Sequence, residues 1–551
     1  MSLGIKLNER NKQEYYRKGY WGEATLADYW QKAVLCVPDK VAVVDQQGTS
    51  YTYSELDQAA SRIASFLKEK GVIPGDFISF QLPNWAEFFV IYIAGLKAGA
   101  VVNPILPGYR ADEVSYILNK CESKVLFIPA EFRGFEYVPM VKSLSSQIPS
   151  LKEVVVVEKG VKAAEGINTF DAVIKNCSPL AVNCTRSADD LAAVLFTSGT
   201  EGSAKGVMLT HNNIIASEKA FTSCLHLTQN DVMLMPAPVT HATGFHHGVT
   251  AAFLVGAKCV LQDIFKPDFS LELIEREKCT WSMGATPFVY DILRSLQKKK
   301  RDISSLRFFL CGGAPVPRHM VKEALEVGIK VMGVYGSTES VPHTMPCMDD
   351  SLEKIVCTDG KPVPGVEIKV VDELRQLVAP GVQGEEASRG PNVFVGYLKE
   401  PELTNWVLDD EGWYYSGDLC TMDNEGYIRI TGRKKDVIIR GGENISSIEI
   451  ENILLQHPNI REAGVVAMPD PRLGERICAY VVLQNHEREI TLEEVKTFFA
   501  SKNVAKCKTP ERMEIVDKLP RTASGKICKY VLRQDIRSKL ERDLKNQCHA
   551  V

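Results

Sequence analysis

The chain has 551 residues, 45% of them hydrophobic, so it can bury more than one core and belongs to the class of globular proteins. Its 65 basic and 69 acidic residues give a formal net charge of -4, which provides no overall electrostatic case for binding nucleic acid or an anionic membrane. Fifteen cysteines without a CxxC pair argue against a complete disulfide framework and favour a reducing cytoplasm.

The N-terminal region contains no pattern typical of export or of a membrane span. Residues 1–21 are polar and charged and lack the apolar segment of a secretory signal peptide, so we do not expect export. The longest apolar stretch, residues 88–106, is interrupted by Lys97, Asn103 and Pro104. It predicts a buried helix followed by a strand in a soluble protein without a transmembrane segment.

The order of the elements up to about residue 345 predicts an α/β fold. A helix capped by Ser54 is expected first, because apolar residues such as Leu56 and Ile63 recur on one helical face after it. Later apolar runs are short, rich in β-branched or aromatic residues, and alternate with helical stretches. These runs comprise residues 124–129, 153–158, 192–197 and 307–313. Such strands are typical of layered α/β domains with largely buried sheets.

The pattern changes twice towards the C-terminus. From about Val363, short candidate strands separated by Gly, Pro and Asp turns predict a small β subdomain at about residues 345–430. An α+β unit follows, with potential capping boxes beginning at Ser446 and Thr491. We place the boundary at Lys435, which gives an N-terminal domain of residues 1–434 and a C-terminal domain of residues 435–551.

The segment with the clearest chemistry is residues 197–206, TSGTEGSAKG, directly after an apolar run. Its backbone N–H groups, hydroxyls and single lysine, Lys205, could surround phosphate oxygens. It is not a Walker loop, because Ala204 stands where that motif has glycine and Gly206 follows the lysine in place of Ser or Thr. Taken alone, the segment could equally be an ordinary Gly/Ser turn.

This segment resembles the phosphate loop of the acyl-CoA synthetase, nonribosomal-peptide adenylation and luciferase superfamily, which reads roughly TSGTTGxPKG. Glu201 and Ala204 depart from that pattern, so one hydroxyl and the fixed φ of a proline are absent. Further segments follow in the order of the superfamily, namely CGGAP at 311–315, VYGSTE at 334–339, WYYSGD at 413–418, ITGR at 430–433 and PRTASGK at 520–526. Each alone could be a turn, but together they identify the chain as a member of this acyl-adenylate-forming superfamily.

The resemblance implies which residues bind ATP. Tyr335 would stack on adenine, and Thr338 would contact the α-phosphate. Glu339, together with Thr200, would hold Mg²⁺, a hard cation that needs few protein carboxylates when it bridges phosphate oxygens. The whole implied nucleotide set is Thr197, Ser198, Gly199, Thr200, Gly202, Lys205, Gly313, Ala314, Pro315, Tyr335, Gly336, Asp418 and Arg433.

Residues nearer the C-terminus complete this implied site. Asp418 would accept hydrogen bonds from both ribose hydroxyls, and Arg433 would contact the ribose and the α-phosphate. Lys526 would be the catalytic lysine that offsets the negative charge of the acyl carboxylate and the α-phosphate. Lys435 takes the hinge position about which a mobile C-terminal domain would rotate. Gly442 would then line the tunnel for the thiol arm of CoA.

The resemblance implies an acyl pocket at His241, Gly244, Phe245 and Ala285. His241 would gate the substrate carboxylate and is also one of the implied catalytic residues. Ala242 stands where amino-acid-activating relatives have an aspartate, so an uncharged hydrocarbon tail is favoured over an amino acid. His241, His246 and His247 could suggest a metal cluster. We favour packing and pocket-lining roles for them, because no carboxylate or cysteine joins them at ligand spacing in the sequence.

Within the superfamily, longer segments such as residues 20–30 resemble the short- or medium-chain fatty acyl-CoA synthetases of enteric bacteria, and carnitine and crotonobetaine CoA ligases are similar. The resemblance implies a ligase that converts a carboxylic acid and ATP to acyl-AMP and pyrophosphate, and then uses CoA to form acyl-CoA and AMP. Its cofactors would be ATP, Mg²⁺ and CoA. A homodimer is compatible with the sequence, which does not determine the oligomeric state.

Three alternatives remain open from the sequence. The acid could be carnitine-like, in which case a cage for a quaternary amine would be needed deep in the pocket. The acceptor could be the phosphopantetheine of a carrier protein. The chain could also be a nucleotide-binding regulator without catalysis, although the presence of both Lys205 and Lys526 argues against that reading.

Overall fold

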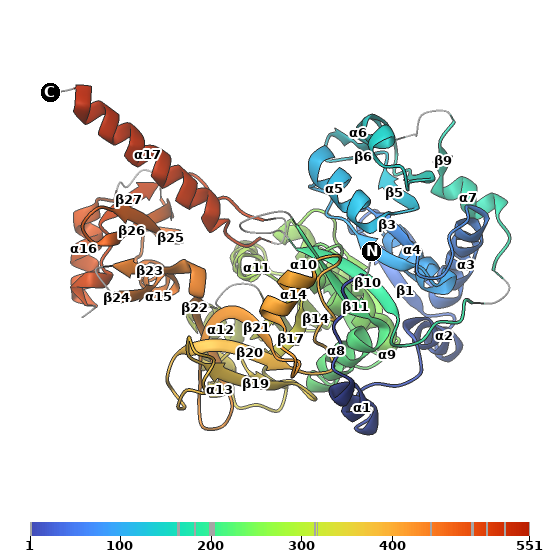
Figure 1. Cartoon of the computed structure of the whole chain (residues 1–551), viewed down its shortest axis with the longest axis horizontal. Coiled ribbons are helices and arrows are strands. Elements are labelled where there is room, and N and C mark those ends of the chain that lie inside the picture. The colour runs from blue at the N-terminus through green and yellow to red at the C-terminus, as the bar shows by residue number, and fades with distance from the viewer. Residues whose placement is uncertain are drawn as a thin grey trace. The chain divides into compact units, whose positions relative to one another are not determined.

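The computed structural model describes residues 3–161, 166–180, 183–197, 204–312, 316, 318–440, 443–485, 490–502, 505–522 and 525–549 (Figure 1). The chain divides into two compact units. The first contains most of the chain up to Ile368 and also Ser388–Tyr415, and the second contains Lys369–Ala387 and the chain from Ser416 onward. Both units mix helices and strands, which confirms the expected α/β class.

The first unit contains a seven-stranded sheet among its described residues, in the order β11-β10-β4-β3-β5-β8-β9. Strand β11 pairs with β10 in an antiparallel hairpin, and the other neighbours are parallel. The strands are β3 (Phe77–Phe80), β4 (Val101–Pro104), β5 (Val125–Pro129), β8 (Glu153–Val157), β9 (Asn168–Thr169), β10 (Leu191–Thr197) and β11 (Lys205–Thr210). A strand therefore begins at Lys205, whereas a Walker loop would be followed by a helix.

A nine-stranded sheet has the order β18-β17-β16-β15-β14-β12-β13-β1-β2. Its consecutive strands from β16 to β1 are parallel, so they all end at one edge. The strands are β1 (Val41–Asp45), β2 (Ser50–Thr52), β12 (Val232–Met235), β13 (Lys258–Leu261), β14 (Trp281–Gly284), β15 (Phe308–Gly312), β16 (Lys330–Ser337), β17 (Ser340–Met345) and β18 (Lys361–Pro362). A separate small hairpin joins β6 (Glu131–Phe132) to β7 (Phe135–Glu136).

Helices pack against both sheets. They are α1 (Glu9–Arg17), α2 (Leu26–Cys36), α3 (Tyr53–Glu69), α4 (Ala86–Ala98), α5 (Ala111–Cys121), α6 (Tyr137–Leu144), α7 (Phe170–Asn176), α8 (His211–Cys224), a π-helix (Gly244–Thr250), α9 (Ala251–Val255), α10 (Pro267–Glu277), α11 (Thr286–Lys298), α12 (Arg318–Glu326), α13 (Leu352–Cys357) and α14 (Pro401–Val407). No described helix is both long and apolar enough to cross a membrane.

Helix α4 forms the centre of the core. It packs against β3 and β4 of one sheet and β1 of the other, and every one of its residues is buried. Lys97, which interrupts the apolar stretch in the sequence, is neutralised by Asp57 at 2.7 Å. The prediction of a buried helix followed by a strand is therefore confirmed. The start of α3 was predicted less well, because Thr52 and not Ser54 caps it, in a capping box with Glu55.

The C-terminal part of the chain contains two more sheets. The first, β19-β20-β21-β22, lies within the expected β subdomain, and the second has the order β24-β23-β26-β25 with β27 paired to β26. The strands are β19 (Glu367–Val371), β20 (Gly384–Arg389), β21 (Tyr414–Met422), β22 (Ile428–Arg433), β23 (Val437–Arg440), β24 (Glu443–Ser446), β25 (Ile460–Asp470), β26 (Gly474–Leu483) and β27 (Arg512–Ile515). Helices α15 (Ser447–Leu454), α16 (Leu492–Ser501) and the long α17 (Lys529–His549) pack with the second sheet (Figure 1).

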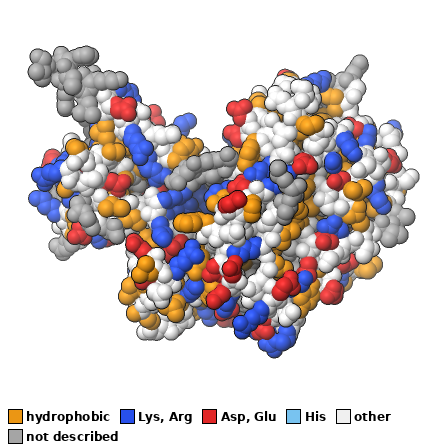
Figure 2. Space-filling view, in the orientation of Figure 1, with side chains coloured by type: hydrophobic (Ala, Val, Ile, Leu, Met, Phe, Trp, Pro, Cys, Tyr) orange, Lys and Arg blue, Asp and Glu red, His pale blue; other side chains and the backbone are white. Residues whose placement is uncertain are grey.

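Positive and negative side chains are intermixed on one face of the molecule. On the face drawn in Figure 2, Lys and Arg side chains alternate with Asp and Glu side chains, and hydrophobic side chains are scattered between them. This distribution agrees with the near balance of 65 basic and 69 acidic residues.

Candidate active site

Four parallel strands of the nine-stranded sheet end on residues that the sequence assigns to the site. His241 follows β12, Ala285 follows β14, and Tyr335 and Gly336 lie at the end of β16. Segment 313–315 follows β15 and lies outside the described residues. Because these strands are adjacent and parallel, the loops after them share one edge, which is where open α/β sheets bind ligands.

The turn after β16 carries the residues implied in phosphate and metal binding. Thr338 and Glu339 form the turn of a hairpin, because Ser337 in β16 pairs with Ser340 in β17. Glu339 is buried, with 8% of its surface exposed, whereas Thr338 is half-buried. A side chain at Gly336 would crowd the returning strand, since its Cβ would lie 3.3 Å from the Ser340 carbonyl oxygen. The hairpin therefore explains why glycine precedes this pair.

The lysine of the expected phosphate loop lies in the other sheet, at the start of β11. Lys205 pairs across the hairpin with Thr197, the last residue of β10. Ser198, Gly199, Thr200 and Gly202 lie outside the described residues. The hairpin thus places both described ends of the loop side by side.

Tyr397 links Lys205 to Glu339. Its hydroxyl donates a hydrogen bond of 2.6 Å to Glu339 Oε1, and the Lys205 ammonium lies 5.4 Å from the centre of its ring. Burial raises the pKa of Tyr397, and the neighbouring Glu339 raises it further, so the hydroxyl remains a proton donor at neutral pH. The structure therefore brings together two residues that the sequence placed in separate motifs.

The backbone around Tyr397 fixes this contact. Leu398 N–H donates to the Gly206 carbonyl at 2.8 Å, and Phe394 N–H donates to the Glu339 carbonyl at 2.8 Å. Sequence reasoning missed Tyr397. The available signal was a tyrosine after glycine in the apolar run at residues 393–398, which reads VFVGYL.

The two candidate ribose ligands also meet. Asp418 in β21 is the cross-strand partner of Arg433 in β22, and Arg433 Nε lies 2.6 Å from Asp418 Oδ1. Asp418 is buried, and its backbone N–H donates to Ser416 Oγ at 3.1 Å. The carboxylate and the guanidinium are therefore held as a pair.

The expected hinge residue, Lys435, lies exposed in a short 3-10 helix, Lys434–Asp436, between β22 and β23. Its neighbours are paired, since Lys434 lies 2.9 Å from Glu385 and Asp436 lies 2.7 Å from Arg533. Gly442 lies outside the described residues, although the flanking strands β23 and β24 pair in an antiparallel manner. The hinge role of Lys435 stays a prediction.

Lys526 lies in a tight loop. Its backbone N–H donates to Thr522 Oγ1 at 3.1 Å, and its carbonyl accepts from Thr522 N–H at 2.8 Å. Arg521 supports the loop by donating to the Gly525 carbonyl at 2.6 Å. The backbone of the lysine is therefore well fixed, and its side chain is half-buried.

The implied acyl-pocket residues lie around the π-helix Gly244–Thr250. A side chain at Gly244 is impossible without rearrangement, because its Cβ would lie 2.4 Å from the Pro238 carbonyl oxygen. Phe245 is buried, and its ring centre lies 4.7 Å from the ring centre of Tyr92 in α4. His241 is half-buried, and its Nδ1 accepts a hydrogen bond of 3.3 Å from Thr243 N–H. A π-helix is rare and often marks a functional site.

The fold brings a carboxylate to two of these histidines, although none stands at ligand spacing in the sequence. Glu218 in α8 reaches His247 at 3.0 Å and His246 at 3.4 Å. This contact could not be predicted from the sequence, because α8 and the π-helix are separated along the chain. Among the described residues, however, no group of three or more His, Cys, Asp or Glu side chains could hold a metal ion.

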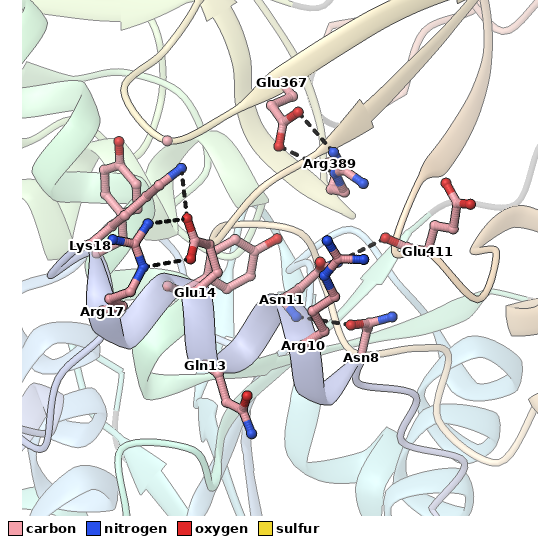
Figure 3. A pocket seen from close by; sticks show the side chains of 13 residues that line it. Asn8, Arg10, Asn11, Gln13, Glu14, Arg17, Lys18, Glu367, Arg389 and Glu411 are labelled. Atoms are coloured by element: carbon pink, nitrogen blue, oxygen red, sulfur yellow. Dashed lines mark hydrogen bonds and ion pairs between the residues drawn. The ribbon is translucent and has the colours of Figure 1, made fainter.

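A polar cavity of about 630 Å³ lies beside α1, apart from the predicted site residues. Most charges that line it are already paired (Figure 3). Glu14 contacts Arg17 at 2.7 Å and Lys18 at 3.2 Å, and Arg389 lies 2.8 Å from Glu367. This pairing leaves little uncompensated charge for a ligand.

Comparison with known proteins agrees with this geometry. A family model described as "AMP-binding enzyme" matches residues 30–398, and one described as "AMP-binding enzyme C-terminal domain" matches residues 449–526. The chain belongs to the AMP-binding enzyme family. The superfamily and the enzymatic nature expected from the motifs are thereby confirmed, whereas the roles of single residues stay predictions.

Full-length relatives are also similar. The chain is 55% identical to a medium-chain fatty-acid–CoA ligase of Escherichia coli, over 99% of this chain and 96% of that protein. It is 32% identical to a 2,3-dihydroxybenzoate-AMP ligase of Bacillus subtilis, over 96% of each. The crystal structure of ATP-bound MatB from Rhodopseudomonas palustris superposes with a TM-score of 0.84 at 28% identity, covering 92% of this chain and 98% of that one.

The first prediction concerns Tyr397. We expect Tyr397→Phe to lower the rate of acid-dependent ATP–pyrophosphate exchange about tenfold or more, because Glu339 loses a hydrogen bond to its charged carboxylate. The matched control is Tyr53→Phe, since Tyr53 is also fully buried and donates a bond of 2.7 Å, but to the backbone carbonyl of Ala257. Equal effects of the two changes on exchange would contradict the role of Tyr397.

Proposed function

We propose that this enzyme is an ATP-dependent fatty acid–CoA ligase for short- or medium-chain acids. A carboxylate oxygen attacks the α-phosphorus of ATP, which forms acyl-AMP and releases pyrophosphate. The thiol of CoA then attacks the acyl carbon, and AMP and a proton leave as acyl-CoA forms. The observation that carries the proposal is the contact of Tyr397 with both Lys205 and Glu339 beside the ends of four parallel strands.

In the first step, Lys205 and Thr200 hold the leaving pyrophosphate, and Thr338 contacts the α-phosphate. Glu339 has the oxygen donors that Mg²⁺ prefers, and its Oε1 is oriented by Tyr397. Glu339, with Thr200, would therefore hold this ion, which when bound neutralises charge on the triphosphate. The paired Asp418 and Arg433 bind the ribose, in keeping with their 2.6 Å contact.

The C-terminal part of the chain acts in both steps. In adenylation, Lys526 offsets the charge of the acyl carboxylate and of the α-phosphate as they approach, a barrier that a positioned cation lowers. Rotation about Lys435 then withdraws Lys526 and presents Gly442 to the thiol arm of CoA. This movement gates the two steps and makes no contribution to the chemistry itself.

The acid bound at His241, Gly244, Phe245 and Ala285 carries a hydrocarbon tail. Phe245 and Ala285 are buried apolar residues, and Ala242, also buried, provides no carboxylate for an amine. The similarity to the E. coli medium-chain fatty-acid–CoA ligase supports this choice of acid. A cytoplasmic location is part of the proposal, supported by the described cysteines, which form no disulfide with one another. A homodimer would be tested by light scattering.

The second prediction is the acid preference. AMP release that depends on both ATP and CoA should be highest with short or medium linear fatty acids, and low with aromatic acids and carnitine. Measuring AMP across such a panel tests this directly. Preference for carnitine would instead support the quaternary-amine alternative.

Two further alternatives give different outcomes in the same assay. A carrier-protein ligase, to which the similarity with a 2,3-dihydroxybenzoate-AMP ligase gives some weight, would release AMP with a carrier protein but not with free CoA. A nucleotide-binding regulator would show no acid-dependent pyrophosphate exchange with any acid.

The third prediction separates the half-reactions. We expect Lys526→Ala to abolish acyl-AMP formation while acyl-AMP supplied to the protein is still converted to acyl-CoA, because the lysine acts only in the first step. Chromatography of acyl-CoA formed from each starting point measures both steps. Lys518→Ala, at an exposed position eight residues earlier in the same segment, is the control and should leave both steps intact. Equal loss of both steps in Lys526→Ala would overturn the assignment.

A further inference from the structure

A buried carboxylate lies behind the proposed acyl pocket. Glu218 of α8 has none of its surface exposed. Its Oε2 accepts from His247 Nδ1 at 3.0 Å, its Oε1 lies 3.4 Å from His246 Nδ1, and Ser217 Oγ lies 2.7 Å from Oε1. Burial opposes ionisation of Glu218, but the facing His247 and His246 outweigh it and hold the pKa of the carboxyl below its usual range. The carboxylate is therefore charged and fully engaged.

Both histidines belong to the π-helix that contains Gly244 and Phe245. The wide turn of a π-helix has a poorer intrinsic geometry than an α-helix, so contacts from the surrounding structure must hold it. His247 is stacked on Phe221 of α8 at 3.9 Å between ring centres, and Thr250 Oγ1 donates to the Phe245 carbonyl at 2.8 Å. Glu218 is the charged group among these contacts.

His246 adds a second observation. Burial lowers the pKa of His246, which favours the neutral ring. With its Nδ1 directed to Glu218, the neutral ring presents a lone pair at Nε2, and this buried atom has no hydrogen-bond partner among the described residues. A buried histidine with one ring nitrogen left without a hydrogen bond lowers the stability of the fold. The contact with Glu218 therefore offsets part of the cost of burying His246.

Helix α8 is itself tied to the nucleotide side of the site. Asn213 Nδ2 donates to the carbonyls of Pro391 and Val393 at 2.9 Å each, directly before the segment that carries Tyr397. Ser217 Oγ also donates to the Val341 carbonyl, in the strand that follows Glu339. Glu218 thus projects from a helix whose place is set by the ATP-binding side.

We propose that Glu218 is a positioning residue that sets acyl-chain selectivity. By holding His246 and His247, it ties the π-helix to α8, which is anchored to the segments on the ATP-binding side. Gly244 and Phe245 belong to the same π-helix and are thereby held in place against the acyl chain. The inference rests on the proposed function, because it assigns the π-helix to the wall of the acyl pocket.

The test is Glu218→Gln, which keeps the shape of the side chain and removes its charge. We expect the KM for the preferred acid to rise about tenfold, as for loss of a charged hydrogen bond, while kcat and the KM for ATP change less than about twofold. The preference among linear acids of different length should flatten. These quantities are measured by CoA-dependent AMP release for each acid.

Variants at His247 sharpen the test. Asparagine can place an amide N–H close to the position of Nδ1, whereas leucine provides no donor. His247→Asn should therefore retain most of the chain-length preference, and His247→Leu should lose it as Glu218→Gln does. Equal behaviour of the two histidine variants would count against the proposal.

Asp231→Asn provides the matched control for stability. Asp231 is a buried carboxylate of the same unit, bonded to Thr280 Oγ1 at 2.8 Å and to Arg307, but it precedes β12 and so lies at the opposite edge of the sheet. The Asp231→Asn substitution should lower the Tm without altering the acid preference. The proposal is overturned if Glu218→Gln keeps the wild-type chain-length profile, or changes the KM for acid and for ATP equally. If the proposed function itself were wrong, the wild-type protein would activate no fatty acid. That outcome differs from a failure of the inference about Glu218.

Discussion

The arrangement of the site depends on how the carboxylate of Glu339 is held. A buried carboxylate loses hydration that hydrogen bonds or cations must replace. The Tyr397 hydroxyl supplies one such bond at 2.6 Å, while the ring of the same residue faces the Lys205 ammonium at 5.4 Å. A single rigid side chain therefore sets the spacing between the phosphate-loop lysine and the carboxylate assigned to the metal ion.

The wider fold serves that spacing. The segment at residues 393–398 bonds to the backbone of Gly206 on one side and of Glu339 on the other, so it joins β11 of one large sheet to the β16–β17 hairpin of the other. Parallel strands β12, β14, β15 and β16 then direct their following loops to one edge. In the proposed function, acid and nucleotide are bound by loops of the same edge, which would place the carboxylate near the α-phosphorus.

Much of this organisation could be predicted from the sequence, because local patterns record it. The buried α4 and the strands β5 and β8 all follow from short stretches of neighbouring residues. Contacts between distant segments could not be predicted in this way. Tyr397 lies 58 positions from Glu339 and Glu218 lies 29 from His247, so only the fold brings each pair together. The cap of α3 was misplaced because Thr52 and Ser54 are both capable caps, and Glu55 decides between them.

The central claim is that a carboxylate oxygen of the substrate attacks the α-phosphorus of ATP at this edge. A fatty acid labelled with the heavy isotope of oxygen in its carboxyl group tests it, with mass spectrometry of the products after turnover with CoA. The account predicts that the label from the attacking oxygen appears in AMP, because the thiol displaces AMP at the acyl carbon. Unlabelled AMP, or label in inorganic phosphate released with ADP, would contradict it.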